Sequence, residues 1–312
     1  MQTYTLSAPA KINLDLEIIG DRPDGYHELV MILQSVALSD RLTLRPNGLE
    51  GFRLSCAHRE VPTDDTNIAY RAAELMAAQF PQHFANFGGV DIDIEKNIPV
   101  AAGLAGGSSN GAAVLVGLDL IWNLGLTKSQ LRDLGARLGS DVPFCIEGGT
   151  VIATGRGERL APITPMESVP VILAKYDNLA VSTAWAYQTY RQRFGDTYKN
   201  FAETGKPKSA HSVPLVNAIF EKDLARIAGL LHNDLEKVVL PEYPRVANLL
   251  SGLKRAGGTA SMMSGSGPTV FTLCESEEQA RTIIEEVRNQ IQDPHLQFWL
   301  THLSNQGITI VN

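Results

Sequence analysis

The stretch Pro99-Val-Ala-Ala-Gly-Leu-Ala-Gly-Gly-Ser-Ser-Asn-Gly-Ala-Ala113 is the part of this sequence that decides its fold. Its glycines allow positive φ and a close approach of the backbone to a ligand. Ser108 and Ser109 are good N-cap residues for the apolar helix expected from Val114 to Trp122. A glycine-rich turn before a helix directs free N–H groups and the positive end of the helix dipole at one point, which suits phosphate.

Two common nucleotide-binding patterns do not fit this stretch. A P-loop requires a lysine after its last glycine, and none follows Gly107; a dinucleotide fingerprint requires glycine where Ala105 stands. The alternative to anion binding is a glycine-rich turn that only lets a helix pack closely. The alternating segment Val90-Asp-Ile-Asp-Ile-Glu95 predicts a strand before the loop. The order strand, loop, helix favours anion binding.

The segments before the loop alternate between strand and turn patterns. Residues 10–18, AKINLDLEI, predict a strand with one buried face and one polar face. The turn at 20–25 and strand-like runs over 29–45 follow. The polar face of the first strand is expected to carry Lys11, Asn13, Asp15 and Glu17.

The remaining pattern is mixed. Helical spacing covers 66–80, with Thr66 or Asn67 as the cap, and 128–138, before Gly139. Strands are expected at 150–154 and 169–174, and residues 191–214 are polar without a period, which predicts a loop or flexible insertion. In the last part of the chain, helical patterns cover 215–232, 244–256 and 276–290. A second glycine-rich turn at 257–268 is followed by a strand pattern at 269–273. This order predicts an α+β protein in two halves.

Composition excludes several classes of function. The 312 residues include 27 basic and 34 acidic side chains, a net charge of −7, which argues against nucleic-acid or membrane-surface binding. The cysteines, Cys56, Cys145 and Cys274, lack CxxC spacing and are expected to be free thiols in a reducing compartment. The N-terminus lacks a signal-peptide pattern, and the apolar region 112–126 is too short to span a bilayer. We expect a cytoplasmic protein.

Taken together, the motifs resemble the GHMP kinase superfamily. Its phosphate loop is matched by Pro99, Gly103, Leu104, Gly106, Gly107, Ser108 and Ser109. Ala105 stands where that family usually has glycine, and alanine costs about 1 kcal/mol or more if positive φ is needed there; we expect the loop to tolerate it. Further segments similar to one member of the family are 8–14, 22–28, 67–73, 139–144 and 264–268.

The resemblance implies a two-domain GHMP kinase fold. The N-terminal, ATP-binding domain, similar to ribosomal protein S5, would cover 1–163, and a ferredoxin-like C-terminal domain would cover 164–312. The member most similar to this chain uses ATP to phosphorylate the 2-hydroxyl of a cytidine diphosphate-linked methylerythritol, in the non-mevalonate route to isopentenyl diphosphate. The alternatives are a homoserine- or mevalonate-type kinase and a non-catalytic nucleotide-binding protein on the same fold.

Two residues are expected to be catalytic. Asp141 lies on a connection between a helix end and Val142-Pro143, where a turn or cap aspartate is the alternative. The resemblance implies that Asp141 orients or deprotonates the attacking hydroxyl, and that Lys11 lies beside it, keeps it ionised and stabilises the transferring phosphoryl group. A solvated strand lysine is the alternative for Lys11. Asn13, roughly 6.6 Å along the strand from Lys11, could hold the substrate.

The resemblance also implies residues for the nucleobase. Tyr26 would stack on the cytosine and His27 would form hydrogen bonds to its edge. Without the resemblance, His27 is a surface loop histidine. A second aromatic is expected in 181–187, where we favour Tyr187 over Trp185, with Thr183 as a further contact. Core packing is the alternative for these aromatics.

ATP would contact the loop and two outlying residues. Asn67 and Lys96 are assigned to the adenosine side, with a helix cap and a surface lysine as alternatives. The turn at 265–267 would bring amides to the phosphates or the erythritol. Mg²⁺ is expected with ATP, but no carboxylate cluster marks its ligands. The loop residues assigned to ATP are Pro99, Val100, Ala101, Ala102, Gly103, Leu104, Ala105, Gly106, Gly107, Ser108 and Ser109.

Overall fold

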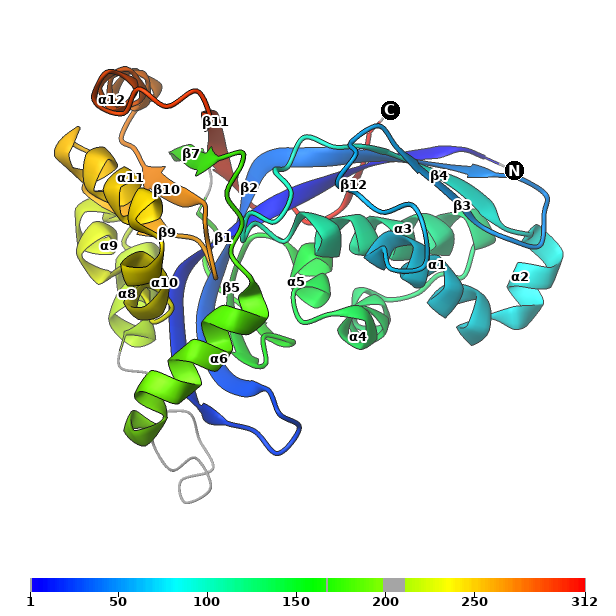
Figure 1. Cartoon of the computed structure of the whole chain (residues 1–312). Helices are drawn as coiled ribbons and strands as arrows, with labels where there is room; N and C mark the ends of the chain where they lie inside the picture. Colours follow the sequence, from blue (N-terminus) through cyan, green and yellow to red (C-terminus); the bar gives the residue numbers. More distant parts are fainter. Residues whose placement is uncertain (1, 167, 199–210, 312) are drawn as a thin grey trace.

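A long antiparallel strand pair forms the spine of the structure (Figure 1). The computed structural model describes residues 2–166, 168–198 and 211–311. Strands β1 (Tyr4–Asp21) and β2 (His27–Pro46) are joined by the expected turn. The free edge of β2 pairs in succession with β5 (Thr150–Gly155), β11 (Leu296–Ser304) and β4 (Val90–Glu95). Segments far apart in the sequence therefore meet along one strand.

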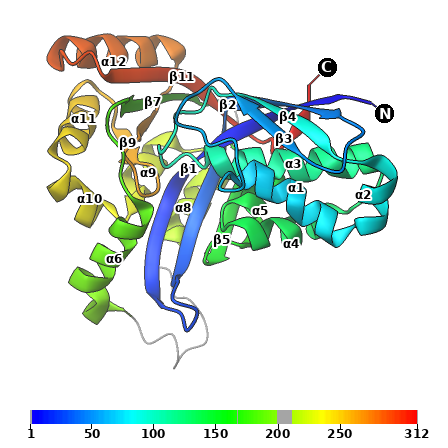
Figure 2. The same ribbon diagram turned by 45° about the vertical axis from the view of Figure 1, so that its right-hand side comes forward.

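Five helices cover one side of the first half of the sheet (Figures 1 and 2). Helix α3 (Gly106–Trp122) packs so closely that a Cβ on Gly117 would lie 2.7 Å from Leu44 Cδ2 and 2.9 Å from Leu6 Cδ1, so a larger residue would displace these side chains. The small strands β3 (Arg53–Cys56) and β6 (Arg159–Pro162) extend the sheet. The helices are α1 (Ile68–Gln79), α2 (Pro81–Phe87), α3 (Gly106–Trp122), α4 (Lys128–Leu138) and α5 (Val142–Glu147).

The second half of the chain continues the sheet through β11. Strand β11 pairs with β7 (Pro170–Tyr176), β7 with β10 (Val270–Leu273), and β10 with β9 (Ala260–Met263). Strands β8 (His232–Asn233) and β12 (Thr309–Ile310) pair with β1. The helices are α6 (Thr183–Phe194), η1 (Gly195–Thr197), α8 (Ser212–Phe220), α9 (Leu224–Leu230), α10 (Glu236–Glu242), α11 (Pro244–Arg255) and α12 (Glu277–Gln290).

A bulge in β1 corrects the predicted polar face. The register with β2 shifts at three places along β1, and the shift between Asn13 and Asp15 places one extra residue in β1. That extra residue reverses which face the following side chains occupy. Lys11 and Asn13 therefore share the cavity face with Leu16, whereas Asp15 is not among the residues that line the cavity. The prediction that all four polar residues share one face is wrong.

Other predictions need smaller corrections. Helix α3 begins at Gly106 with Ala105 as its N-cap residue, so Ser108 and Ser109 lie inside its first turn and are not N-caps. The segment 257–268 contains the strand β9, and 215–232 is divided into α8 and α9 around Lys222, which has positive φ.

The predicted loop at 191–214 is partly wrong. Helix α6 continues to Phe194 and α8 begins at Ser212, while 199–210 lie outside the described residues. Among the described residues, none of the helices has the length and apolarity required to cross a membrane.

Candidate active site

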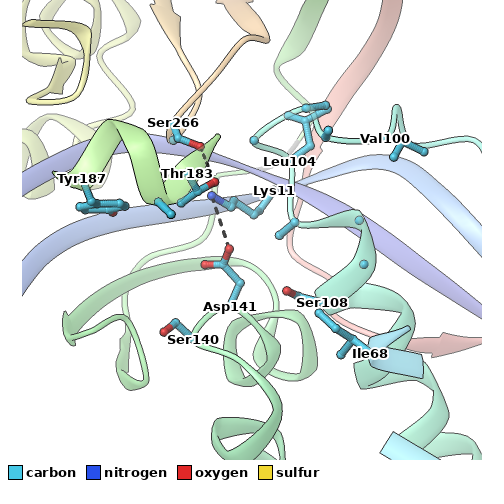
Figure 3. A pocket seen from close by; sticks show the side chains of 18 of the residues that line it. Lys11, Ile68, Val100, Leu104, Ser108, Ser140, Asp141, Thr183, Tyr187 and Ser266 are labelled. Atoms are coloured by element: carbon cyan, nitrogen blue, oxygen red, sulfur yellow. Dashed lines mark hydrogen bonds and ion pairs between the residues drawn. The ribbon is translucent and has the colours of Figure 1, made fainter. Parts of the chain in front are cut away.

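One cavity of about 930 Å³ contains most of the predicted site residues. Its walls come from β1, the β1–β2 turn, the loop before α3, the start of α5 and the start of α6 (Figure 3). The glycine-rich loop lines one end, and Tyr26, His27 and Tyr187 line the other. Lys11 and Asp141 lie on the wall between these two ends.

Lys11 and Asp141 form the ion pair that the resemblance implied. Lys11 Nζ lies 3.9 Å from Asp141 Oδ2 and donates a hydrogen bond of 2.7 Å to Asn13 Oδ1. The Lys11 side chain is only 6% exposed and that of Asp141 33% exposed, so the pair is shielded at the lysine and open to the cavity at the carboxylate. The solvated-lysine alternative is wrong.

Asp141 is the N-cap residue of α5, but its side chain makes no capping hydrogen bond. Its backbone has φ −86° and ψ −14°, and Pro143 follows in the first turn of the helix. The carboxylate is therefore not used by the backbone of its own helix, unlike most aspartates at that position. It points toward Lys11 and the cavity (Figure 3).

The phosphate loop approaches the cavity through a series of left-handed residues. Ala101, Gly103 and Ala105 have φ of 49°, 72° and 56°. Helix α3 starts directly after them, so the free N–H groups of its first turn lie at the loop end of the cavity. Ala105 does need positive φ, at a cost of about 1 kcal/mol. The loop therefore accommodates an alanine in the left-handed region.

The two glycine-rich turns pack against each other. A Cβ on Gly103 would lie 2.4 Å from Ser264 O and 2.9 Å from Gly267 O. Ser264 Oγ also donates a hydrogen bond of 3.1 Å to Gly103 O. The second turn thus contacts the phosphate loop at Gly103, and its residues Gly265 and Ser266 line the cavity.

Most of the residues assigned to ATP line the cavity, with one exception. Ser108 lines it, whereas the Ser109 hydroxyl is buried and donates a hydrogen bond of 2.8 Å to Pro9 O. Asn67 lines the cavity, but its side chain also caps α1 through Ala69 N and donates to Pro62 O. The helix-cap alternative for Asn67 is therefore observed as well.

A carboxylate that the sequence analysis missed organises the loop. Asp40 on β2 is 1% exposed and forms an ion pair with Lys96, so Lys96 is not a surface lysine. Asp40 Oδ1 accepts hydrogen bonds of 2.8 Å from the backbone N–H groups of Asn97 and Ile98. Asp40 Oδ2 accepts one of 2.8 Å from Asn110 Nδ2 on α3. One buried side chain therefore joins the entry of the loop to the helix that follows it.

The far end of the cavity is aromatic. His27 is 6% exposed, and its ring lies 5.2 Å from that of Tyr187 on α6. Its Nε2 has no hydrogen-bond partner among the described residues. Burial and the charge of Arg191 lower the pKa of His27 to about 4, so its imidazole is neutral at pH 7. The surface-histidine alternative is wrong.

The other aromatic predictions are partly resolved. Tyr26 is 51% exposed, with the Arg156 guanidinium 5.1 Å from its ring centroid. Tyr187 lines the cavity, while Trp185 packs against Tyr243 at 5.4 Å and does not line it. The Thr183 hydroxyl lies at the cavity, 2.8 Å from the Ser266 hydroxyl. An aromatic pocket beside a neutral imidazole can receive a flat base that carries hydrogen-bonding groups.

The site does not identify a metal ligand. In the part of the chain that the structure describes, no group of three or more His, Cys, Asp or Glu side chains could hold a metal ion. Mg²⁺ commonly binds through phosphate oxygens and water with few protein ligands.

The comparisons with known proteins agree with this geometry. Residues 67–149 match the GHMP kinases N terminal domain, and 215–293 match the GHMP kinases C terminal. The chain is 62% identical over 312 residues to a 4-diphosphocytidyl-2-C-methyl-D-erythritol kinase of Gloeothece citriformis, covering 99% of each chain. It is 55% identical to the corresponding kinase of Synechocystis sp., covering 100% of each.

The solved structures give the same result for the fold. A crystal structure of 4-(cytidine 5'-diphospho)-2C-methyl-D-erythritol kinase superposes with a TM-score of 0.76 at 29% identity, covering 97% of this chain and 100% of that one. A homoserine kinase from Cytophaga hutchinsonii, at 16% identity and a TM-score of 0.75, shares the fold. The predicted α+β GHMP kinase fold is confirmed, while the domain boundary at 163/164 stays a prediction. The chain belongs to the GHMP kinases and, among them, to the family of 4-diphosphocytidyl-2-C-methyl-D-erythritol kinases.

Proposed function

We propose that this chain transfers the γ-phosphoryl group of ATP to the 2-hydroxyl of 4-diphosphocytidyl-2-C-methyl-D-erythritol, giving the 2-phosphate and ADP. The observation that carries the proposal is the position of the Lys11–Asp141 pair, at 3.9 Å, between the phosphate loop and the aromatic end of one cavity. A kinase for this substrate needs a phosphate site, a hydroxyl-activating group and a base pocket in that order. The relatives at 55–62% identity carry the name of this activity.

The catalytic roles follow from the geometry of the pair. Asp141 accepts the proton of the attacking 2-hydroxyl, or a hydrogen bond from it, and aligns its oxygen with the γ-phosphorus. The Lys11 ammonium keeps the Asp141 carboxylate ionised and stabilises the negative charge on the transferring group. Asn13, which accepts a hydrogen bond from Lys11, fixes the direction of the ammonium group. No covalent phosphoenzyme is required.

The two ends of the cavity divide the substrates between them. At the loop end, the N-terminus of α3 and the loop amides bind the ATP phosphates. Mg²⁺, when bound with ATP, neutralises phosphate charge. At the other end, Tyr26 and Tyr187 stack on the cytosine, and the neutral His27 forms hydrogen bonds to its edge. We expect the reaction in the cytoplasm, since free thiols such as Cys145 persist in reducing compartments.

The test is ADP release with a panel of acceptors. The purified protein is given ATP, Mg²⁺ and, in separate reactions, the cytidine substrate, homoserine or mevalonate. We expect ADP release only with the cytidine substrate, and phosphorus NMR of the product should show a phosphate monoester at the 2-position. Equal rates with homoserine or mevalonate would reassign the chain to another GHMP kinase activity. Nucleotide binding without turnover of any acceptor would favour a non-catalytic protein.

A further inference from the structure

The aromatic end of the cavity is assembled from two separate elements. One wall is the turn between β1 and β2, which carries Tyr26, together with His27 at the start of β2, and the other is α6, which carries Tyr187. Figures 1 and 2 show α6 beside the end of this hairpin. The width of a pocket between two such walls depends on whatever fastens them together.

Arg191 on α6 makes that connection. Its Nε donates a hydrogen bond of 2.7 Å to Asp21 Oδ1, and its Nη2 donates one of 3.0 Å to Gly25 O. These two acceptors lie at the end of β1 and immediately before Tyr26, so the guanidinium spans the mouth of the turn. Arg191 is four residues after Tyr187 and therefore lies on the same side of the helix.

The rigid fork of the guanidinium suits this position. Arginine presents several N–H donors in one plane and can bind a carboxylate and a carbonyl at once, which a lysine ammonium does with less directional control. In the described part of α6, both hydrogen bonds to residues 20–27 come from Arg191. The rings of His27 and Tyr187 also pack against each other across the two walls.

The exposure of the Arg191 contact indicates where its effect should appear. The Arg191 side chain is 37% exposed and that of Asp21 is 50% exposed. Ion pairs this open to solvent contribute little to the free energy of unfolding. A contact that barely stabilises the fold can still select one separation of the two walls. Its loss should therefore affect binding at this end of the cavity and leave the rest of the protein intact.

We propose that Arg191 is a positioning residue that fastens the β1–β2 turn to α6 and thereby sets the nucleobase pocket for a cytidine diphosphate-linked substrate. The inference rests on the proposed function for the identity of that substrate. Arg191 itself lines the cavity, and its hydrogen bonds to the turn act on the positions of Tyr26, His27 and Tyr187 and not on the reacting atoms. It is therefore expected to change the KM for the cytidine substrate and not the chemical step.

The test compares Arg191→Gln with a matched control, Arg193→Gln. Arg193 lies on the same helix but pairs with Glu242, away from the turn. In Arg191→Gln we expect the KM for the cytidine substrate to rise about tenfold, as for the loss of a charged hydrogen-bond pair, with kcat and the KM for ATP unchanged. Arg193→Gln should match the wild type. Asp21→Asn, on the other side of the contact, should reproduce the selective KM effect, and Arg191→Lys should recover part of the loss.

Three outcomes would overturn the inference. The first is an unchanged KM in Arg191→Gln, and the second is an equal rise in Arg193→Gln. The third is a fall in kcat with a rise in the KM for ATP, which would indicate a general loss of structure. CDP binding by calorimetry adds an arm that does not need turnover. If the wild type binds CDP but does not turn over, the proposed function fails, while a tenfold weaker CDP affinity in Arg191→Gln still supports the positioning role.

Discussion

Replacing Asp40 by asparagine tests a deeply buried ion pair beside the phosphate loop. The Asp40 side chain has no measurable exposure, and that of its partner Lys96 is 6% exposed. The same carboxylate accepts hydrogen bonds from the backbone N–H groups of Asn97 and Ile98 and from Asn110 Nδ2. An asparagine has the same shape but no charge, and it replaces one acceptor oxygen by an NH₂ group that donates.

The expected magnitude follows from what remains after the substitution. The asparagine oxygen can still accept from the two backbone N–H groups, but its NH₂ group then faces the Lys96 ammonium and the Asn110 amide, which are donors. Removing one partner of a buried ion pair costs about 3–5 kcal/mol, and we expect Asp40→Asn to lower the free energy of unfolding by about 4 kcal/mol. Lys96→Met leaves Asp40 with its other donors and should cost less.

Urea unfolding followed by circular dichroism measures these differences. The combined Asp40→Asn and Lys96→Met variant should be more stable than the sum of the single effects predicts, because neither charge is then left unpaired. The control is Asp93→Asn, a partly exposed carboxylate on β4 that accepts from Ser55 Oγ, expected within about 0.5 kcal/mol of the wild type. A loss in Asp40→Asn no larger than that of Asp93→Asn, or additive effects in the double variant, would refute the reasoning.

Three further predictions follow from single residues. Burial and the nearby charges of Glu17 and Asp234 raise the pKa of Asp15 to about 8. The native state then holds a proton that the unfolded state releases, so stability falls as pH rises from about 4 to 8, by up to about 1.4 kcal/mol per pH unit. Asp15→Asn should flatten this dependence in urea unfolding at pH 6 and 8, and an unchanged slope would contradict the assignment. His27, which faces Asp21, Arg191, Tyr187 and Tyr198, should titrate by NMR with a pKa of about 4, and Arg191→Gln should raise that value; a pKa of 6.5 in the wild type would be inconsistent with its burial. Ala105→Gly should stabilise the protein by about 0.5 kcal/mol, because glycine adopts the observed φ of 56° without strain but has more freedom when unfolded; a destabilised variant in thermal unfolding would contradict this.

Local patterns predicted many elements but not their orientation. The alternation of β1 was visible in the sequence, and so was the cap of α1 at Asn67. The bulge that separates Asp15 from Lys11 and Asn13 was not, since an inserted residue leaves the alternation of polar and apolar residues unbroken while the backbone reverses its faces. The sequence pattern therefore located the strand correctly but assigned two of its polar side chains to the wrong face.

The site was harder to predict, because its residues come together from distant parts of the sequence. Lys11 and Asp141 meet only because α5 packs beneath β1, and spacing alone could not have paired them; the family resemblance did. Asp40 was missed, although an aspartate within a strand-like run is unfavourable and usually has a specific reason. Arg191 was missed because it was assigned to the polar stretch 191–214, whereas it continues the helix that carries Tyr187.

The Asp141→Asn variant provides the most direct test of the central claim that one carboxylate activates the acceptor hydroxyl. Its rate of ADP release with the cytidine substrate is compared with that of the wild type, and its affinity for ATP is measured in parallel by calorimetry. We predict a loss of turnover of at least about 100-fold with ATP affinity nearly unchanged, because asparagine keeps the size of the side chain and the proposed ATP contacts come from the loop before α3. Turnover at the wild-type rate in Asp141→Asn would contradict the account.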